Sequence, residues 1–366
     1  MDATVLPPGG VVDVLVIGGG IAGLSLASEL AAATDVLLLE AEPTLAYHTS
    51  GRSAQQLIPS YGPEPVRALT RRTLEALAAM PAAGRPLAWP SRFLLVGSPA
   101  DVRAHASETM RDIGHAAARV LVPALVPDAF AAAALDETSV RTDAGALIEH
   151  HRSLAAARGA RILTGRRVDA ARRVGSEWLV RAGGESFRAR RVVDAAGAWA
   201  DQVAELFGAR PLGLVPLRRT AAYVDVRNPL PPGTPMVGAA DHSWYFRPEG
   251  GRVLVSPSEA EPAEPGDARP RDRDVGDLVA RINEVTTLGV TGVHRAWTGL
   301  RTEAPDGVPA LGPDPDVGGF FWLAGQGGYG FQTSAGMAEL AAALLLGRQP
   351  PFPPEVVAAL DPARLR

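Results

Sequence analysis

Short apolar runs that end in glycines form the clearest pattern along the chain. The first run, Val11–Ile17, is followed by glycines at 18–20 and then by apolar residues at helical spacing. This order predicts a strand, a tight turn and a helix. A second apolar run, Val36–Leu39, ends at Glu40, as the second strand of a βαβ unit would.

Two further segments repeat this order. Residues 188–208 (RARRVVDAAGAWADQVAELFG) and residues 319–347 (GFFWLAGQGGYGFQTSAGMAELAAALLLG) begin with an apolar run, continue through glycine and finish at helical spacing. Strands that alternate with helices favour an α/β fold around a parallel sheet. We therefore predict a Rossmann-type nucleotide-binding domain that is assembled from separated segments.

The segments between these units follow a different pattern. Residues 86–142 combine a short apolar strand with helical and proline-broken stretches, and residues 215–256 alternate as antiparallel strands do. We expect an α+β substrate domain with an antiparallel sheet there. Its predicted bounds are residues 86–142 and 215–297, which leaves residues 1–85, 143–214 and 298–366 to the nucleotide-binding domain. The proline-rich, charged residues 258–274 are expected to form a solvated loop without a chemical role.

Composition narrows the possible functions. The chain has 366 residues, enough for two domains, and its formal net charge of −4 gives no reason to expect a nucleic-acid partner. No apolar run is long enough for a signal peptide or a membrane span, so we expect a cytoplasmic protein. Cysteine and lysine are absent, which excludes thiolate metal ligands, a cysteinyl cofactor link and Schiff-base chemistry on lysine. No metal site is expected.

The first glycine turn carries a dinucleotide-binding pattern. Residues 18–23 (GGGIAG) fit G-x-G-x-x-G, in which Gly18 makes the turn, Gly20 admits a pyrophosphate and Gly23 allows close packing of helix on strand. Glu40 lies 22 residues after Gly18, where a carboxylate accepts ribose hydroxyls and repels a 2′-phosphate. The residues predicted to contact the dinucleotide here are Gly18, Gly20, Ile21, Ala22, Gly23, Glu40 and Ala41.

Seven sequence blocks add a family resemblance. They are VIGGGIAGLSLASEL, YHTSGRSAQQLIPSYGPEPVRALT, DAAGAWAD, RPLGLVPLRRTAAYV, SWYFRPEGG, AWTGLRTEAPDG and GFFWLAGQGGYGFQTSA, and together they cover most of the chain. In these blocks the chain resembles the D-amino-acid oxidase and glycine oxidase family of flavoproteins, and is most similar to D-arginine dehydrogenase. The resemblance implies FAD as cofactor, bound without a covalent link and lying across both domains. A histidyl link through His48 is the less favoured alternative.

The resemblance also assigns flavin contacts to three further segments. One would surround the pyrophosphate and the ring, one would pass the nucleotide, and one would direct a positive helix end at the flavin's pyrimidine edge. The residues so implied are Ser50, Gly51, Arg52, Ser53, Ala54, Val168, Ala196, Gly197, Trp199, Arg301, Gly327, Gly328, Tyr329, Gly330, Phe331 and Gln332.

The resemblance places Arg301 where a substrate carboxylate binds. The planar guanidinium of arginine binds carboxylates through two parallel hydrogen bonds. The other catalytic positions that the resemblance implies are Tyr61, Arg219, Tyr245 and Gln332. Four simpler interpretations stay open. Arg301 could pair with Asp306 or Glu303 to brace its loop, and Arg218 or Arg219 could be a surface charge at a strand end. Tyr61 and Tyr245 could be ordinary tyrosines at a domain edge, and Gln332 could only cap its helix.

The expected substrate pocket departs from that of the arginine-specific relative. Where that relative has an acidic residue for the guanidinium of its substrate, this chain has Phe93, with Arg92 beside it. Gln56 and Ile58 also differ from it, and Gly328 completes the predicted pocket. We expect a substrate with a neutral or apolar side chain, or an acidic one if Arg92 points inward.

The implied reaction is the FAD-dependent oxidative deamination of a D-amino acid. Hydride would pass from the α-carbon to flavin N5, and the imino acid would hydrolyse to a 2-oxo acid, with O₂ or a quinone as electron acceptor. Two alternatives stay open. The chain could oxidise another amine or a 2-hydroxy acid, such as a biosynthetic intermediate, or it could be a flavin-carrying subunit of a complex.

Overall fold

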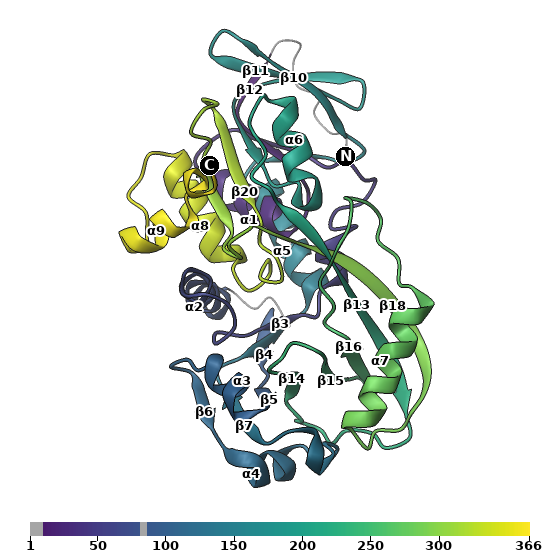
Figure 1. Cartoon of the computed structure of the whole chain (residues 1–366). Helices are drawn as coiled ribbons and strands as arrows, with labels where there is room; N and C mark the ends of the chain where they lie inside the picture. Colours follow the sequence, from purple (N-terminus) through teal and green to yellow (C-terminus); the bar gives the residue numbers. More distant parts are fainter. Residues whose placement is uncertain (1–9, 81–85) are drawn as a thin grey trace.

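The computed structural model describes residues 10–80 and 86–366, and two large sheets organise them (Figure 1). The first sheet has a parallel centre, in the order β12-β1-β2-β9, and β20 adds to β12 in parallel. The ribbon β10-β11 extends it antiparallel from β12, and β19 pairs with β20. Its strands are β1 (Val11–Ile17), β2 (Val36–Leu39), β9 (Arg161–Leu163), β10 (Val168–Val174), β11 (Glu177–Ala182), β12 (Glu185–Asp194), β19 (Ala310–Pro313) and β20 (Phe320–Ala324).

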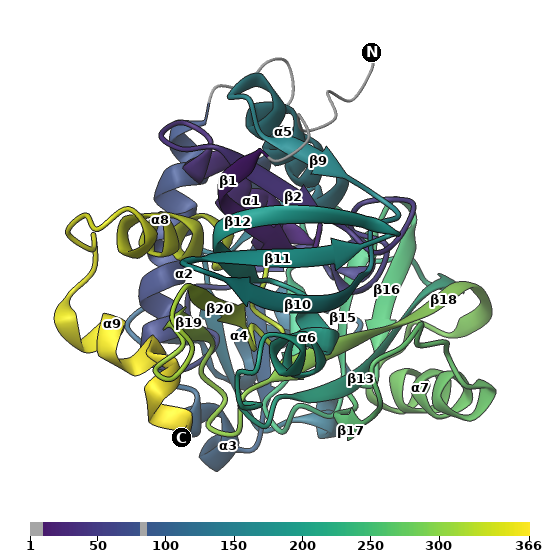
Figure 2. The same ribbon diagram turned by 90° about the horizontal axis from the view of Figure 1, so that it is seen from above.

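The central strands are apolar along their length because helices or other strands cover both faces. Along β1, Val14 and Val16 face one hydrophobic core and Leu15 and Ile17 face another. Helices α1 (Ile21–Leu30), α5 (Ala144–Ala157) and α8 (Ser334–Leu345) contribute to the first core, while α6 (Ala200–Leu206) and the β10-β11 ribbon contribute to the second (Figure 2). The three predicted strand–glycine–helix units are thus confirmed.

The second sheet is mostly antiparallel and is dominated by the long pair β13 and β18, which run together in Figure 2. Only β14 and β5 pair in parallel within it among the described strands. Its strands are β5 (Phe93–Gly97), β6 (Met110–Asp112), β7 (Ala132–Asp136), β13 (Val215–Val226), β14 (Met236–Ala239), β15 (Tyr245–Glu249), β16 (Arg252–Ser256), β17 (Glu261–Pro262) and β18 (Val290–Glu303).

A small three-stranded sheet joins three segments that are separated in the sequence. It consists of β3 (Gln56–Leu57), β4 (Ala88–Pro90) and β8 (Val140–Thr142). The remaining helices are α2 (Glu64–Ala79), α3 (Pro99–Ala104), α4 (Gly114–Leu121), α7 (Asp272–Val285) and α9 (Pro354–Leu360). Within residues 10–80 and 86–366, no helix has the length and hydropathy needed to cross a bilayer.

The predicted fold class, an α/β nucleotide-binding part built from separated segments beside an α+β part with an antiparallel sheet, is confirmed. The division into two domains at the predicted residues stays a prediction. One expectation was wrong in part: residues 258–274 do not form a free, solvated loop. They include β17 and the start of α7, and Arg52 and Arg218 donate hydrogen bonds to the backbone carbonyls of Ala268 and Arg269.

Candidate active site

A cavity of about 510 Å³ is lined by residues of both large sheets. At one end lie the glycine turn after β1 and the carboxyl end of β2. At the other end lie β5, β13, β14, β15 and β18. We call these the nucleotide end, represented by Gly18, Gly20 and Glu40, and the substrate end, represented by Arg219 and Arg301.

Two glycines of the nucleotide end border the cavity, and the backbone requires glycine at the first of them. Gly18 has a φ of 111°, which residues with a side chain rarely adopt, and a Cβ there would overlap the carbonyl oxygen of Ala195. A Cβ on Gly20 would lie 3.1 Å from Ser50 Oγ. The turn therefore presents bare backbone to the cavity, as a phosphate-binding turn does.

Glu40 holds this turn in place as well as lining the cavity. Its Oε2 accepts a hydrogen bond from Gly19 N at 2.6 Å, and its Oε1 accepts one from Glu42 N at 2.8 Å. A carboxylate has about four lone-pair sites, so acceptor capacity is left for the predicted ribose hydroxyls.

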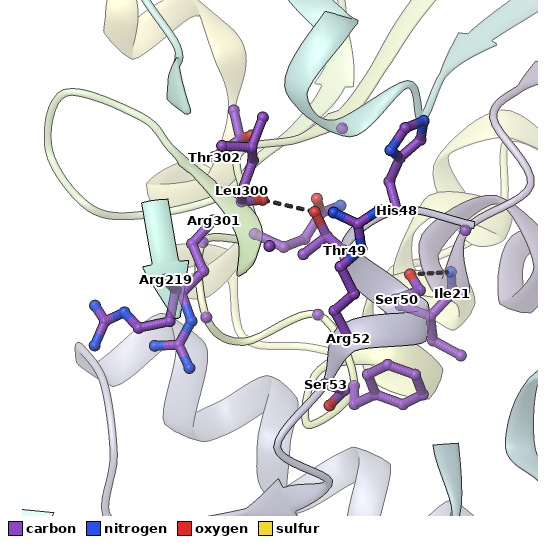
Figure 3. A pocket seen from close by; sticks show the side chains of 18 of the residues that line it. Ile21, His48, Thr49, Ser50, Arg52, Ser53, Arg219, Leu300, Arg301 and Thr302 are labelled. Carbon is purple, nitrogen blue, oxygen red and sulfur yellow. Dashed lines mark hydrogen bonds between the residues drawn. The ribbon is translucent and has the colours of Figure 1, made fainter. Parts of the chain in front are cut away.

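The segment 49–54 runs along the cavity and is fixed by its side chains (Figure 3). Ser50 Oγ accepts a hydrogen bond from Ile21 N at 3.0 Å, and Thr49 Oγ1 donates to the carbonyl oxygen of Leu300 at 2.7 Å. Arg52 donates to the carbonyl oxygen of Thr298 at 2.7 Å and forms an ion pair with Asp267. Arg52 lies on the wall as predicted, but its terminal nitrogens bind protein rather than the cavity.

Arg219 and Arg301 project from adjacent strands on the same face of the second sheet. In the antiparallel register of β13 and β18, Leu217 is opposite Arg301 and Arg219 is opposite Gly299. The two arginines are thus diagonal neighbours. Figure 3 shows both side chains on the same side of the pocket, and the charge of Arg301 lies near enough to affect Arg219. Arg218 faces the other way and donates to the carbonyl oxygen of Arg269 at 2.7 Å.

Neither cation of the substrate end has a carboxylate partner among the described residues. Asp306, which could have braced Arg301, instead binds Arg364 at 2.7 Å, and Glu303 forms no ion pair with Arg301 within the described part of the chain. Burial lowers the pKa of Arg219 and the nearby charge of Arg301 lowers it further, while Tyr245, Tyr61 and Glu259 act in the opposite direction. Two unpaired cations in one cavity favour the binding of an anion.

The tyrosines and Gln332 form the adjoining wall. Tyr245 is buried, and the ring of Tyr61 lies 5.3 Å from that of Tyr329. Gln332 Nε2 donates to the carbonyl oxygen of Tyr61 at 3.2 Å and to Thr70 Oγ1 at 3.0 Å, so its amide holds the wall together. Loss of water raises the pKa of Tyr329.

The predicted substrate pocket is apolar where the sequence suggested. Phe93 and Ile58 are buried on the cavity wall, and Gln56 Nε2 donates to the carbonyl oxygen of Ser91 at 2.9 Å. A Cβ on Gly328 would lie 2.7 Å from Arg301 Nη1, so glycine is needed for that guanidinium to lie here. Arg92 donates to the carbonyl oxygen of Gly233 at 2.8 Å and does not line the cavity, so the condition for an acidic side chain is not met.

The structure brings most of the predicted site residues to one cavity. Gly23, Gly51 and Tyr329 are the exceptions, since none of them lines it. A Cβ on Gly23 or Gly51 would overlap the carbonyl oxygen of Gly18 or Ala46, so both glycines serve close packing. The others that line it are Gly18, Gly20, Ile21, Ala22, Glu40, Ala41, Ser50, Arg52, Ser53, Ala54, Gln56, Ile58, Tyr61, Phe93, Val168, Ala196, Gly197, Trp199, Arg219, Tyr245, Arg301, Gly327, Gly328, Gly330, Phe331 and Gln332.

Sequence reasoning missed the far wall of the substrate end. Leu95, His105, Met110, Met236 and His242 also line the cavity. They come from short strands and turns without a motif, and the sequence held no signal that would have found them.

Comparisons with known proteins agree with this architecture. A family model described as FAD dependent oxidoreductase (DAO) matches residues 13–344. Human mitochondrial dimethylglycine dehydrogenase is 27% identical over 208 residues, which cover 51% of this chain and 23% of that protein. The bovine FAD-dependent oxidoreductase domain-containing protein 1 is 31% identical over 173 residues, 42% of this chain and 35% of that protein. The chain thus matches only a quarter to a third of the length of these relatives.

Two solved structures share the fold over almost the whole chain. Glycine oxidase from Geobacillus kaustophilus superposes with a TM-score of 0.81 at 24% identity and covers 93% of this chain and 96% of its own. L-proline dehydrogenase from P. horikoshii superposes with a TM-score of 0.82 at 20% identity and covers 97% of each chain. At these identities the likeness concerns the fold.

Proposed function

The chain belongs to the DAO family of FAD-dependent oxidoreductases, and from this membership we propose that it oxidatively deaminates a D-amino acid with a neutral or apolar side chain. The observation that carries the proposal is the pair of cations, Arg219 and Arg301, that share a cavity and have no carboxylate partner among the described residues. The product would be an imino acid, which water converts to a 2-oxo acid.

The residues at the nucleotide end fit FAD. Gly18 and Gly20 present backbone at the cavity wall, and Glu40 keeps acceptor capacity beside them. His48 has its Nδ1 buried without a partner among the described residues, and its Nε2 lies 3.1 Å from Glu42. We propose that FAD binds here without a covalent link. When bound, it supplies the acceptor for the hydride that leaves the substrate.

The two arginines would fix one end of the substrate. Each guanidinium can donate two parallel hydrogen bonds to an α-carboxylate, and orientation of this kind accounts for a large part of the rate in reactions that need one bond to point at its acceptor. One bound carboxylate neutralises only one of the two cations. The remaining positive charge disfavours a neighbouring ammonium group, so Arg219 and Arg301 also favour the neutral amine from which oxidation proceeds.

The apolar wall would accept the side chain. Phe93, Leu95, Met110 and Met236 line the substrate end, and no carboxylate among the described residues of that wall could pair with a cationic side chain. A guanidinium or ammonium on the substrate would also be repelled by Arg219 and Arg301. Both features support a neutral or apolar side chain over that of arginine.

The test is anaerobic mixing of the flavin-loaded protein with a substrate panel, followed through the bleaching of flavin absorbance. We expect D-methionine, D-leucine, D-phenylalanine or D-proline to bleach the flavin faster than D-arginine or any L-amino acid. A clear preference for D-arginine or D-lysine would contradict the proposed side-chain class. Faster bleaching by L-amino acids would contradict the proposed stereochemistry.

A second candidate is the oxidation of another amine or of a 2-hydroxy acid. It is favoured by the same arginine pair, because a carboxylate clamp does not distinguish an α-amine from an α-hydroxyl. Bleaching by 2-hydroxy acids but not by amino acids would support it. Peroxide formation under air would identify O₂ as electron acceptor, and its absence with turnover on an added quinone would identify a dehydrogenase.

A further inference from the structure

Two histidines that no motif singled out meet at the wall of the substrate end. His105 follows α3, and His242 lies in the turn between β14 and β15. Both line the cavity, and their Nε2 atoms are 3.0 Å apart. The ring of His242 lies 6.1 Å from that of Tyr61. The pair therefore borders the space beside the arginines.

The backbone at His242 is held in an uncommon conformation. Its φ is 58°, in the left-handed region that side-chain-bearing residues seldom occupy. The turn is fixed by Asp241, whose Oδ1 accepts hydrogen bonds from Ser243 N at 3.0 Å and from Ser243 Oγ at 2.6 Å. Backbone strain of this kind persists where the surroundings enforce it, and it is concentrated at ligand-binding sites.

The hydrogen bonds of the pair determine which nitrogens carry protons. His105 Nδ1 lies 2.9 Å from the carbonyl oxygen of Asp101, which can only accept, so this nitrogen carries a proton. When both rings are neutral, His105 Nε2 is then the acceptor and His242 Nε2 the donor. His242 Nδ1 is left with a free lone pair, and it has no hydrogen-bond partner among the described residues.

The surroundings of His242 lower its pKa and so favour the uncharged ring. Loss of water lowers its pKa, and repulsion from His105 on one side and from Arg219 and Arg301 on the other lowers it further, while Asp241 in its own turn acts in the opposite direction. His242 lines the cavity and is exposed, so at neutral and alkaline pH its Nδ1 is an uncharged hydrogen-bond acceptor that is open to water or to a ligand.

We propose that the His105–His242 pair determines substrate specificity, with His242 Nδ1 accepting a hydrogen bond from an uncharged N–H or O–H group at the end of the substrate side chain. The substrate class is an amino acid with an apolar stem and a carboxamide or hydroxyl tip. This inference rests on the proposed function, since it takes Arg219 and Arg301 as the site of the α-carboxylate. The stem then lies along Phe93 and its apolar neighbours.

Three substrates with side chains of similar length test whether His242 accepts a hydrogen bond from the tip of the side chain. Glutamine ends in N–H donors, methionine has no donor, and glutamate ends in an anion that a neutral acceptor repels. A guanidinium also carries donors, but Arg219 and Arg301 repel its charge.

The experiment compares flavin bleaching by glutamine, methionine and glutamate, at about pH 8, in whichever enantiomer bleaches the wild-type protein. The variants are His242→Gly, because glycine adopts a positive φ without strain, and His105→Phe, which removes the ring nitrogens and keeps a ring. We expect wild type to prefer glutamine. The glutamine-to-methionine ratio of kcat/KM should fall about tenfold in His242→Gly, the size of effect that one specific hydrogen bond produces.

The His105→Phe variant and the rates on each substrate distinguish a loss of specificity from a general loss of activity. In His105→Phe the ratio should fall by a smaller factor, about threefold, because His242 loses the partner that fixes its tautomer. Rates on methionine should change less than threefold in either variant. A glutamine-to-methionine ratio that is unchanged in both variants, or an equal loss on all three substrates, would overturn the inference. Wild-type flavin that no amino acid bleaches would instead overturn the proposed function and, with it, this inference.

Discussion

At the nucleotide end of the cavity, Glu40 and Ser50 already bind backbone N–H groups of the chain, whereas at the substrate end Arg219 and Arg301 have no carboxylate partner among the described residues. The first end is built around the turn after β1 and the carboxyl end of β2, which are close in sequence, and further wall residues come from around Val168, Ala196 and Gly330. The second is formed by side chains from strands about 80 residues apart, brought together by the register of β13 and β18.

The difference fits the ligand that we propose for each end. A turn whose hydrogen bonds are satisfied is rigid before the cofactor arrives, which suits a constant ligand. Cations without a carboxylate partner carry a desolvation cost that a bound anion would offset, so we expect the substrate end to select for charge. Arg52 marks the boundary between the two, since it lines the cavity but is bound by Asp267, Ala268 and Thr298.

Removal of Arg301 should have the largest effect. Arg301→Ala removes a pair of charge-assisted hydrogen bonds, each of about 1.5–3 kcal/mol. At about 1.4 kcal/mol per decade, kcat/KM should fall by roughly two to four decades. Stopped-flow reduction of the flavin-loaded variant measures this. Arg295→Ala is the matched control, because Arg295 lies on the same strand but is exposed, and it should retain its rate. Near-native turnover of Arg301→Ala would remove this residue from the clamp.

A substitution at Glu40 should weaken FAD binding at the nucleotide end and leave the substrate end unchanged. In Glu40→Gln one of the two oxygens becomes an NH₂ group, which cannot accept from Gly19 N or Glu42 N. We expect the Kd for FAD to rise by roughly 10- to 100-fold, from the loss of a charged hydrogen bond of about 1.5–3 kcal/mol. Titration of apoprotein with FAD measures this. The kcat/KM of the flavin-loaded fraction should stay unchanged, and a loss there would show that the two ends are not independent.

Acidification should shift side-chain preference at the substrate end. A proton added to the His105–His242 pair turns His242 Nδ1 from acceptor into donor, and a positive charge then favours a carboxylate. Because the pKa of His242 is lowered, the change should occur below the ordinary imidazole pKa of about 6.5. We expect the glutamate-to-glutamine ratio of kcat/KM to rise about tenfold as the pH falls. The ratio cancels the titration of the α-amine, and it should be independent of pH in His242→Gly.

The smallest effect should be on thermal stability, and it should come from replacement of Asp194, a buried acid near the glycine turn. Asp194 ends β12, opposite Ile17; its Oδ1 accepts from Ala196 N at 3.0 Å, and its Oδ2 is buried without a partner among the described residues. Burial raises its pKa, and Asp201 adds to the shift against the effect of Ala196 N. A raised carboxyl pKa stabilises the fold fully below the unfolded-state pKa, and this stability is lost as the pH rises through the folded-state pKa.

Asp194→Asn should therefore gain stability relative to wild type as the pH increases. We expect its Tm to exceed that of wild type by about 2–4 °C at alkaline pH, and the difference to shrink in acid. Thermal unfolding followed by circular dichroism over a pH series checks this. Asp316→Asn, at an exposed position, should show no such trend. A constant difference at all pH values would point to packing rather than ionisation.

Much of the nucleotide end could be predicted from the sequence because its information is local. A strand buried on both faces is apolar throughout, a turn at positive φ needs glycine at position 18, and a carboxylate at the end of the next strand follows from the βαβ connection. The positions of Arg301 and Arg219 could be predicted only through resemblance, since nothing in a lone arginine between strand residues indicates a ligand.

By itself, then, the sequence determined the fold class and the glycine turn, and only its family resemblance indicated the side chains that could bind a carboxylate. Tertiary structure alone decided which charges remained unpaired, that Asp306 and Asp267 bind other arginines, and that His105 meets His242. The physical reason is range: turns and apolar periodicity depend on neighbours a few residues away. Charge pairing and tautomer choice depend on distances between atoms that are far apart in the chain.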